Sequence, residues 1–387
     1  MNILFIVPST YPDRGGVERV TYLVAKENRY KNVVSFAMTK DADINKDGVF
    51  KSVIFFKGLT LKKFLDFLQK NKIDLIVNQL SYDMRIVDFL QKIQILPIIS
   101  CFHGSPTFYK DEMDLLLFER HIPLFCKMRI RALFKKAIYP FYDPYSKAFN
   151  LSCQISERFI LLSERFLEPF IRTYNLQRFN NLSYVNNPLS LDVFFEGDYS
   201  VKKKTVLVVC RLSDMKKRVS LILKIWKEIE QKNASKDWDL IIVGGGKDET
   251  VLRKLVETLQ LKRCTFVGPK INVVDYYRMS SIFLMTSLNE GWGLTVTEAM
   301  QMGCVPVAFN TYLSLSEIIS DGEDGFIIPD NEFQTFCTAV ISLMQDEVKR
   351  KHMAYNGIKN AKKFSLSSIS DKWYSLFKVV VDEYKNI

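Results

Sequence analysis

Two glutamates and two glycines lie close together in the stretch Leu288–Pro306, which reads LNEGWGLTVTEAMQMGCVP. Glu290 precedes Gly291 and Gly293, and Glu298 follows Glu290 by eight positions. The glycines predict a tight turn between an apolar strand and a helix. Free N–H groups at a helix start bind phosphate, whereas carboxylates beside such a turn repel phosphate and bind hydroxyls. The pattern therefore indicates a site for a compound that carries both phosphate and sugar hydroxyls.

A simpler interpretation of the same residues stays open. Thr295 and Glu298 have the spacing of a capping box, in which Glu298 would only bond to a backbone N–H at the helix start. Glycine turns before helices are also common in α/β proteins. The local spacing alone does not separate a capping role for Glu298 from a ligand-binding role.

Basic residues form a second candidate group, in the run RLSDMKKR from Arg211 to Arg218. This run follows a predicted strand at 205–210 and precedes a predicted helix through Trp226. Cations at a strand end would face the same crevice as the glutamates and would neutralise a leaving diphosphate. The alternative is a basic loop on a basic protein, without a role in binding.

Two further groups follow predicted strands in the first half of the chain. Gly15 and Gly16 come after the apolar run 2–8 and precede a predicted helix, which is either a second ligand-binding turn or an ordinary connection. His103 follows the predicted strand 97–101. Its place at a strand end makes it a candidate site residue, and a structural histidine is the alternative.

The run EGWGLTVTEAMQMGCVPV resembles the E-x7-E signature of family 4 retaining glycosyltransferases, which have the GT-B fold. Further motifs similar to those of the family recur in order along nearly the whole chain. The resemblance implies that Glu298 holds the ribose of a sugar nucleotide and that Glu290 lies against the transferred hexose. Trp292 stands where most members have Phe or Tyr.

The same resemblance implies an arginine and a lysine that clamp the diphosphate. The arginine is Arg211, and Lys217 is preferred over Lys216 because the helix that follows matches better from that register. His103 would contact the donor sugar or its phosphate, and Val267 would lie near the nucleotide base. The residues that the resemblance places near the donor are Gly15, Gly16, His103, Val267, Gly291, Gly293, Leu294 and Glu298.

A chain of 387 residues is too long for one ordinary core, and its alternating apolar strands and helices predict α/β architecture. The resemblance implies two Rossmann-like domains that face each other across a cleft, with a C-terminal helix that crosses back to the first domain. The expected boundaries are 1–192 for an acceptor-binding domain, 193–366 for a nucleotide-sugar-binding domain, and 367–387 for the returning helix.

The net charge of +11 is concentrated in the first half of the chain, since residues 1–195 carry +8 of it. A strongly basic half of a chain predicts an anionic binding partner. Residues 127–138 interleave lysines and arginines with large apolar side chains, which is typical of a helix on an anionic membrane surface. An amphipathic helix docked on its own domain, with solvated charges, is the alternative.

The cysteines and histidines are few and lack the spacing of a metal site, so neither a zinc site nor a disulfide framework is expected. No apolar run approaches the ~18 residues that a membrane span needs. The N-terminal run reads as a strand and not as a signal peptide. We expect a cytoplasmic protein, peripheral on the inner face of the membrane if residues 127–138 bind lipid.

The resemblance implies a metal-independent enzyme without a cofactor and without a nucleic-acid partner. It would transfer a hexose, with retention of configuration, from a nucleotide sugar, expected to be UDP-linked, to a saccharide acceptor. The basic charge of the first half of the chain, which would bind an anionic membrane, suggests a lipid-linked acceptor. Such acceptors serve in the synthesis of bacterial lipopolysaccharide, capsule or exopolysaccharide. Two alternatives remain: an epimerase or hydrolase of UDP-sugars that uses His103 and Glu290 as acid and base, and a non-catalytic nucleotide-binding scaffold on the membrane.

Overall fold

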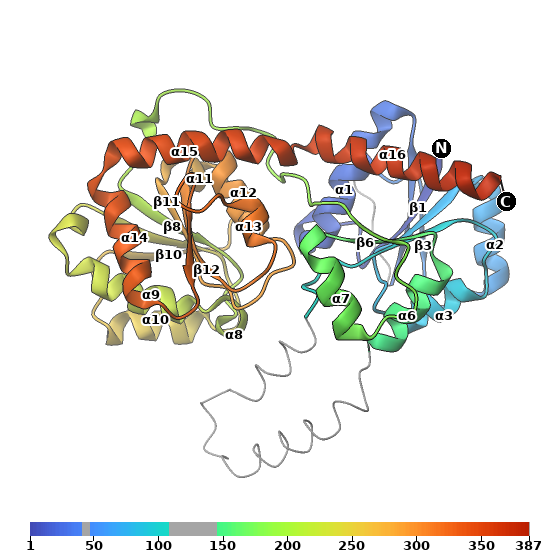
Figure 1. The fold of residues 1–387 in the computed structure, drawn as a ribbon, viewed down its shortest axis with the longest axis horizontal. Helices are drawn as coiled ribbons and strands as arrows, with labels where there is room; N and C mark the ends of the chain where they lie inside the picture. The colour runs from blue at the N-terminus through green and yellow to red at the C-terminus, as the bar shows by residue number, and fades with distance from the viewer. Residues whose placement is uncertain (41–46, 108–144, 387) are drawn as a thin grey trace, which may run out of the picture. The chain divides into compact units, whose positions relative to one another are not determined.

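The computed structural model describes residues 1–40, 47–107 and 145–386 of the chain (Figure 1). The basic segment 127–138, for which the sequence predicts an interfacial helix, lies outside the described residues. No helix in the described part of the chain is both long and apolar enough to cross a membrane.

The chain divides into two compact units, one of which is built from both ends of the sequence. Unit 1 consists of Met1–Pro188 and Leu366–Ile387. Unit 2 is the continuous stretch Leu189–Ser365. These boundaries lie within a few residues of the expected ones, and residues 366–387 belong to unit 1.

A parallel sheet of seven strands forms the centre of unit 1. Its strands are β1 (Asn2–Ile6), β2 (Val34–Thr39), β3 (Val53–Phe55), β4 (Leu75–Asn78), β5 (Ile98–Cys101), β6 (Arg158–Leu161) and β7 (Leu182–Tyr184). They are ordered β3-β2-β1-β4-β5-β6-β7. Leu4 pairs with Phe36 on one side and with Ile76 on the other, and all three are fully buried. A sheet covered on both faces requires such continuous apolar strands.

The helices of unit 1 cover this sheet. They are α1 (Gly16–Asn28), α2 (Leu61–Lys70), α3 (Met84–Gln91), α6 (Ser146–Ile155), α7 (Leu167–Tyr174) and α16 (Leu366–Lys385), with short 3-10 turns at Pro12–Arg14, Arg29–Lys31 and Glu164–Phe166. As predicted, a helix follows the glycine pair, and it buries Val20, Leu23 and Val24. The C-terminal helix α16 packs on α1 (Figure 1), and the ring of its Phe377 lies 6.3 Å from that of Phe5.

One expectation about unit 1 is wrong. The sequence predicts a helix broken at Pro169, but α7 is continuous through this residue. Pro169 is the third residue of the helix, where a backbone N–H has no partner within the helix in any case. The proline therefore removes no helical hydrogen bond.

Unit 2 repeats the architecture with a parallel sheet of six strands. The strands are β8 (Thr205–Val209), β9 (Asp239–Val243), β10 (Cys264–Gly268), β11 (Ile282–Met285), β12 (Val305–Asn310) and β13 (Phe326–Pro329). The helices are α8 (Asp214–Lys217), α9 (Val219–Glu230), α10 (Glu249–Thr258), α11 (Val274–Met279), α12 (Leu294–Gln301), α13 (Leu315–Ile318), α14 (Phe333–Gln345) and α15 (Glu347–Ala361), with 3-10 turns at Tyr199–Val201, Asn233–Ser235 and Lys362–Phe364. The short helix α8 was not anticipated from the sequence.

The strand order of unit 2 is β10-β9-β8-β11-β12-β13, so the direction of winding reverses between β8 and β11. Trp226, Trp238 and Phe336 are buried in its own core. In sheets of this kind ligands bind beyond the carboxyl ends of the strands where the order reverses. In unit 1 the corresponding reversal lies between β1 and β4.

Candidate active site

The glycine turn lies at the carboxyl end of β11, at the reversal point of unit 2. Gly293 is the residue before α12 and has φ = 94°, a left-handed conformation that favours glycine. A Cβ atom at this position would lie 2.6 Å from the Tyr312 hydroxyl. Glycine is therefore required both by the backbone and by the close approach of Tyr312. The helix α12 ends just before Gly303, which is also left-handed at φ = 70°.

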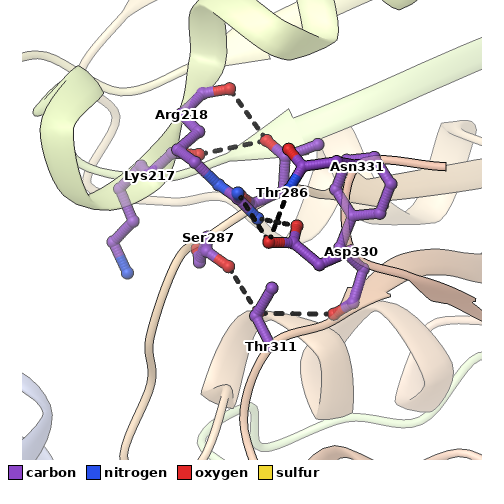
Figure 2. Close-up of polar contacts among 8 residues, drawn as sticks. Lys217, Arg218, Thr286, Ser287, Thr311, Asp330 and Asn331 are labelled. Carbon is purple, nitrogen blue, oxygen red and sulfur yellow. Dashed lines mark hydrogen bonds and ion pairs between the residues drawn. The ribbon is translucent and has the colours of Figure 1, made fainter. Parts of the chain in front are cut away.

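Side chains after β12 hold the turn from one side. The Thr311 hydroxyl donates to the Ser287 carbonyl at 2.6 Å (Figure 2). The Ser314 hydroxyl donates to the Gly291 carbonyl at 3.2 Å. Trp292 is buried in the turn, and its ring meets that of Phe364 edge-on, with centroids 5.1 Å apart. The backbone of the turn is thus fixed before any ligand binds.

Lys217 and Glu290 meet at this edge of the sheet. The Lys217 ammonium donates to Glu290 Oε1, and the two side chains are 25% and 16% exposed. Burial disfavours the charge of Lys217, but the Glu290 carboxylate outweighs burial and holds the lysine pKa above its ordinary value. The structure therefore joins two residues that the sequence places 73 positions apart.

The other basic candidates have different surroundings. Arg211 and Lys216 are both exposed, on the loop and the short helix that follow β8. The positive charge of Arg211 lies near enough to Lys217 to oppose its protonation. The charge of Lys217 is thus favoured by Glu290 and opposed by Arg211.

Glu298 lies in the second turn of α12, not in the first turn as expected from the sequence. Its side chain is buried, and the residue is only 3% exposed. The Ser190 hydroxyl donates to Oε1, and the Tyr277 hydroxyl donates to Oε2 at 2.8 Å. The capping box with Thr295 does not form, because α12 begins at Leu294 with Gly293 as its cap.

Two of these contacts were missed from the sequence. Ser190 is the second residue of unit 2 and directly follows the run Asn187-Pro188-Leu189, and Tyr277 lies on α11. Their hydroxyls satisfy a buried carboxylate that would otherwise be costly. The run NNPLS and a tyrosine on a short helix carry no local signal of this role, since both lie far from Glu298 in sequence.

In unit 1, His103 lies just beyond β5 and lines a cavity of about 260 Å³. The other lining residues are Val17, Gln79, Tyr82, Phe102, Gly104, Tyr145 and Phe149. His103 Nε2 lies 2.6 Å from Gln79 Oε1, and Nδ1 is buried. Burial lowers the His103 pKa to about 4, and the neighbouring Asn187 offsets this only in part. The imidazole is therefore neutral at pH 7.

The glycine pair of unit 1 opens α1 near the same cavity. Gly16 is the first residue of α1, and Val17 lines the cavity together with His103. Gly15 is extended, and a Cβ atom there would lie 2.7 Å from Glu18 Oε2. The structure thus places the start of α1 and the end of β5 around one cavity.

Val267 lies apart from the residues at the reversal point. It belongs to β10, the edge strand of unit 2, which is two strands away from β8. The pairing of β10 with β9 is irregular between Phe266 and Gly268, so Val267 is not paired across the sheet.

Within the described residues there is no group of three or more metal-binding side chains.

Comparison with known families identifies unit 2. A sequence profile of the family described as "Glycosyl transferases group 1" matches residues 193–360. This part of the chain belongs to that family. The group 1 match covers the whole of the β8–β11 site, including both glutamates and Lys217.

Several curated relatives of the chain are named as bacterial glycosyltransferases. The amylovoran biosynthesis glycosyltransferase of Erwinia amylovora is 26% identical over 57% of this chain and 61% of its own. A Campylobacter jejuni enzyme, named as an α-1,4-N-acetyl-D-galactosaminyltransferase acting on a diphospho-undecaprenol-linked saccharide, is 23% identical over 69% of this chain and 68% of its own. The chain spans about three fifths of the length of the Erwinia relative.

Solved structures resemble the group 1 domain together with unit 1. Anabaena HepE in complex with UDP has a TM-score of 0.74 and 18% identity, and the match covers 98% of this chain and 100% of that one. The lipopolysaccharide outer core galactosyltransferase WaaB has a TM-score of 0.67 and 18% identity, over 97% and 98% of the two chains. The chain therefore has the GT-B fold, as the sequence resemblance implies.

Proposed function

We propose that the protein is a retaining, metal-independent glycosyltransferase of family 4. It transfers a hexose from a UDP-sugar to a saccharide in the synthesis of a bacterial surface polysaccharide. The observation that carries this proposal is the Lys217–Glu290 ion pair at the reversal point of the group 1 domain. The names of the bacterial relatives and the UDP bound to HepE support the substrate class.

Each residue of the site has a task in this reaction. Lys217 and Arg211 stabilise the negative charge that develops on the leaving diphosphate. Glu290 accepts hydrogen bonds from the hexose, while its charge keeps the Lys217 side chain in place. Glu298 accepts hydrogen bonds from the ribose, and Ser190 and Tyr277 orient its carboxylate.

The acceptor in this proposal binds to unit 1, at the cavity beside His103. Tyr82, Phe102 and Tyr145 line it with aromatic surface, which suits the apolar face of a sugar ring. Gln79 supplies a hydrogen-bonding group for the acceptor. The neutral His103 imidazole keeps the role that the resemblance implies, a contact with the donor sugar or its phosphate. A lipid-linked acceptor is consistent with the charge excess of residues 1–195 and with the name of the Campylobacter relative.

The experiment that tests this proposal is calorimetric titration of the protein with UDP, GDP and ADP, with and without EDTA. We expect micromolar binding of UDP, insensitive to EDTA, and weaker binding of the other two. The matching UDP-sugar is then incubated with candidate acceptors, and the anomeric configuration of the product is read by NMR. Transfer with inversion, or chelation-sensitive binding, would contradict the mechanism.

Two results would favour other functions. Release of free sugar without an acceptor would indicate a hydrolase or epimerase. Nucleotide binding without any turnover would indicate a scaffold.

Membrane association has a separate test. Reversal of charge at Lys135 and Lys136 should weaken binding to vesicles that contain anionic phospholipid, because each basic side chain near such a surface contributes about 1 kcal/mol. Neutral vesicles serve as the control. Equal binding of the variant and the wild type would rule out this segment as the membrane contact.

A further inference from the structure

Arg218, the residue after Lys217, has an unusual backbone conformation. It joins α8 to α9 with φ = 49° and ψ = 42°, in the left-handed region. Side chains other than glycine, asparagine and aspartate rarely adopt this conformation, since it brings Cβ close to the backbone. Strain of this kind persists only where the surrounding contacts impose it.

The contacts that impose this conformation begin with the Arg218 guanidinium. Nε donates to the Thr286 carbonyl at 2.6 Å. The two terminal nitrogens donate to the Asp330 carboxylate, at 2.8 Å and 3.3 Å. The guanidinium also lies over the Phe309 ring, 5.5 Å from its centroid. The side chain is 14% exposed, so this two-point ion pair is shielded from solvent more than a typical surface pair.

Thr286 also contacts the end of α8, where Lys217 lies. Its hydroxyl lies 3.1 Å from the Lys217 carbonyl and 2.9 Å from the Arg218 carbonyl, and bonds to both (Figure 2). The Leu288 N–H donates to the Lys216 carbonyl at 2.8 Å. Residues 216–218 are therefore bound to residues 286–288, and Glu290 follows two residues later.

The side chain of Lys217 takes no part in this network. In Figure 2 it extends away from the Arg218 guanidinium and from Asp330. Arg218 therefore acts on Lys217 only through the backbone. Asp330 directly follows β13, so the ion pair connects the junction of α8 and α9 to a third element of unit 2.

We propose that Arg218 and Asp330 are positioning residues that hold the Lys217 backbone so that its ammonium meets Glu290. We call this ion pair the Arg218–Asp330 clamp. Without it, the contacts of Thr286 and the Leu288 N–H with residues 216–218 remain, but the two-point contact that fixes the left-handed conformation of residue 218 is lost. The Lys217 side chain then has no single position from which to reach Glu290.

The variants that test the clamp are chosen to remove a side chain without adding strain to the backbone. Arg218→Gly removes the guanidinium but keeps a residue that adopts the left-handed conformation without strain. Asp330→Ala removes the carboxylate. Lys204→Ala is the matched control, because it breaks an ion pair of unit 2 with Asp237, at 3.1 Å, at the opposite end of β8.

The first measurement is the rate at which an N-hydroxysuccinimide ester acetylates Lys217, read by mass spectrometry with exposed Lys224 on α9 as internal reference. Only the free amine reacts, so a fall of one unit in the lysine pKa raises the rate about tenfold. We expect Arg218→Gly and Asp330→Ala to raise the Lys217 rate several-fold relative to Lys224. The double variant Arg218→Gly/Asp330→Ala should not raise the Lys217 rate beyond that of the single variants. Lys204→Ala should leave the rate unchanged.

This measurement does not depend on the proposed function. An unchanged Lys217 rate in folded variants would overturn the clamp. A rise shared by Lys224 would also overturn it, since it would indicate general loosening. If Arg218→Gly does not fold, Asp330→Asn replaces it, because it keeps the size of the side chain and removes its charge.

The second measurement rests on the proposed function. With a UDP-sugar that the wild type uses, we expect the clamp variants to lower kcat about 10- to 100-fold, because Lys217 is misplaced in the transition state. The KM for the donor should change less than twofold, since a contact made mainly in the transition state affects kcat. Equal losses in Lys204→Ala would contradict a positioning role. Absence of turnover in the wild type would refute the transferase proposal and leave the acetylation result standing.

Discussion

Two adjacent lysines, Lys216 and Lys217, differ in what surrounds them. Lys216 is exposed, whereas Lys217 is largely covered and paired with Glu290. Sequence spacing did not separate the two, because both follow Arg211 at a plausible distance. The ion pair supports Lys217 as the residue that meets the diphosphate, and a pair of single substitutions tests this.

Lys217→Ala should lower kcat about 10²- to 10³-fold, as removal of one group that stabilises transition-state charge typically does. It should also weaken UDP binding. Lys216→Ala is the matched control, because it removes the same charge from the preceding residue. It should change kcat and the dissociation constant of UDP less than about threefold. Steady-state kinetics and calorimetry measure both effects. Comparable losses in the two variants would assign the role to the charge of the loop and not to Lys217.

His103 links the cavity of unit 1 to the pH dependence of stability. Its pKa in the folded protein is about 4, below the ordinary value of 6.5, so the folded state binds fewer protons than the unfolded state between these values. The contribution of the uncharged His103 to the stability of the folded state is complete above pH 6.5. It is lost as the pH falls towards 4, because the unfolded state then binds a proton that the folded state does not. Between pH 7 and pH 5 this residue should reduce the free energy of unfolding by about 1–2 kcal/mol.

Urea unfolding of His103→Gln at the two pH values measures this contribution. The variant should lose less stability than the wild type over the interval. His352→Gln, which removes an exposed imidazole from α15, is the control and should behave as the wild type. The same loss in all three proteins would show that other groups determine the acid sensitivity.

At the scale of elements, the glycine turn and α12 depend on Gly293. Gly293→Ala combines a left-handed backbone with a methyl group 2.6 Å from the Tyr312 hydroxyl. We expect a loss of about 2–4 kcal/mol in the free energy of unfolding. Gly322→Ala is the matched control, because Gly322 has φ = 78° and a methyl group there would meet no neighbouring atom within 4 Å. It should lose only about 1 kcal/mol.

A second background separates the clash from the backbone strain. In Tyr312→Phe the hydroxyl is absent, so Gly293→Ala should cost less there than in the wild type, and closer to the cost at Gly322. Thermal or urea unfolding of the four proteins completes the cycle. An equal loss of unfolding free energy in both backgrounds would mean that the backbone of the turn shifts to accommodate the methyl group, and that the Tyr312 hydroxyl does not contribute to the loss.

The elements themselves were largely predictable, because strands covered on both faces are continuous apolar runs. The strands β5 and β8 lie within one residue of the predicted ranges 97–101 and 205–210. The features of the site that the sequence did not predict have a common cause in contacts between residues distant in sequence. Nothing near Arg218 signals its left-handed conformation, because its partner Asp330 lies 112 positions away. The partners of Glu298 were missed for the same reason.

At the scale of the whole molecule, each unit has a core of its own. Phe377 on α16 is fully buried in unit 1, and Phe336 on α14 is fully buried in unit 2. Replacement of either phenylalanine by alanine should cost about 3–5 kcal/mol. Phe377→Ala should accelerate amide hydrogen exchange in β1 and α1 while β11 keeps its protection. Phe336→Ala should have the opposite pattern, and loss of protection throughout in either variant would show that the units unfold together.

The division of the chain also has a consequence for its synthesis. Unit 2 is complete once residue 365 has left the ribosome, whereas unit 1 still lacks α16. Until then the face of α1 that meets α16 is uncovered, and Phe5 lacks its Phe377 neighbour. Uncovered apolar surface on a nascent chain invites aggregation and chaperone binding. The half of the protein that is translated first is therefore the half that finishes folding last.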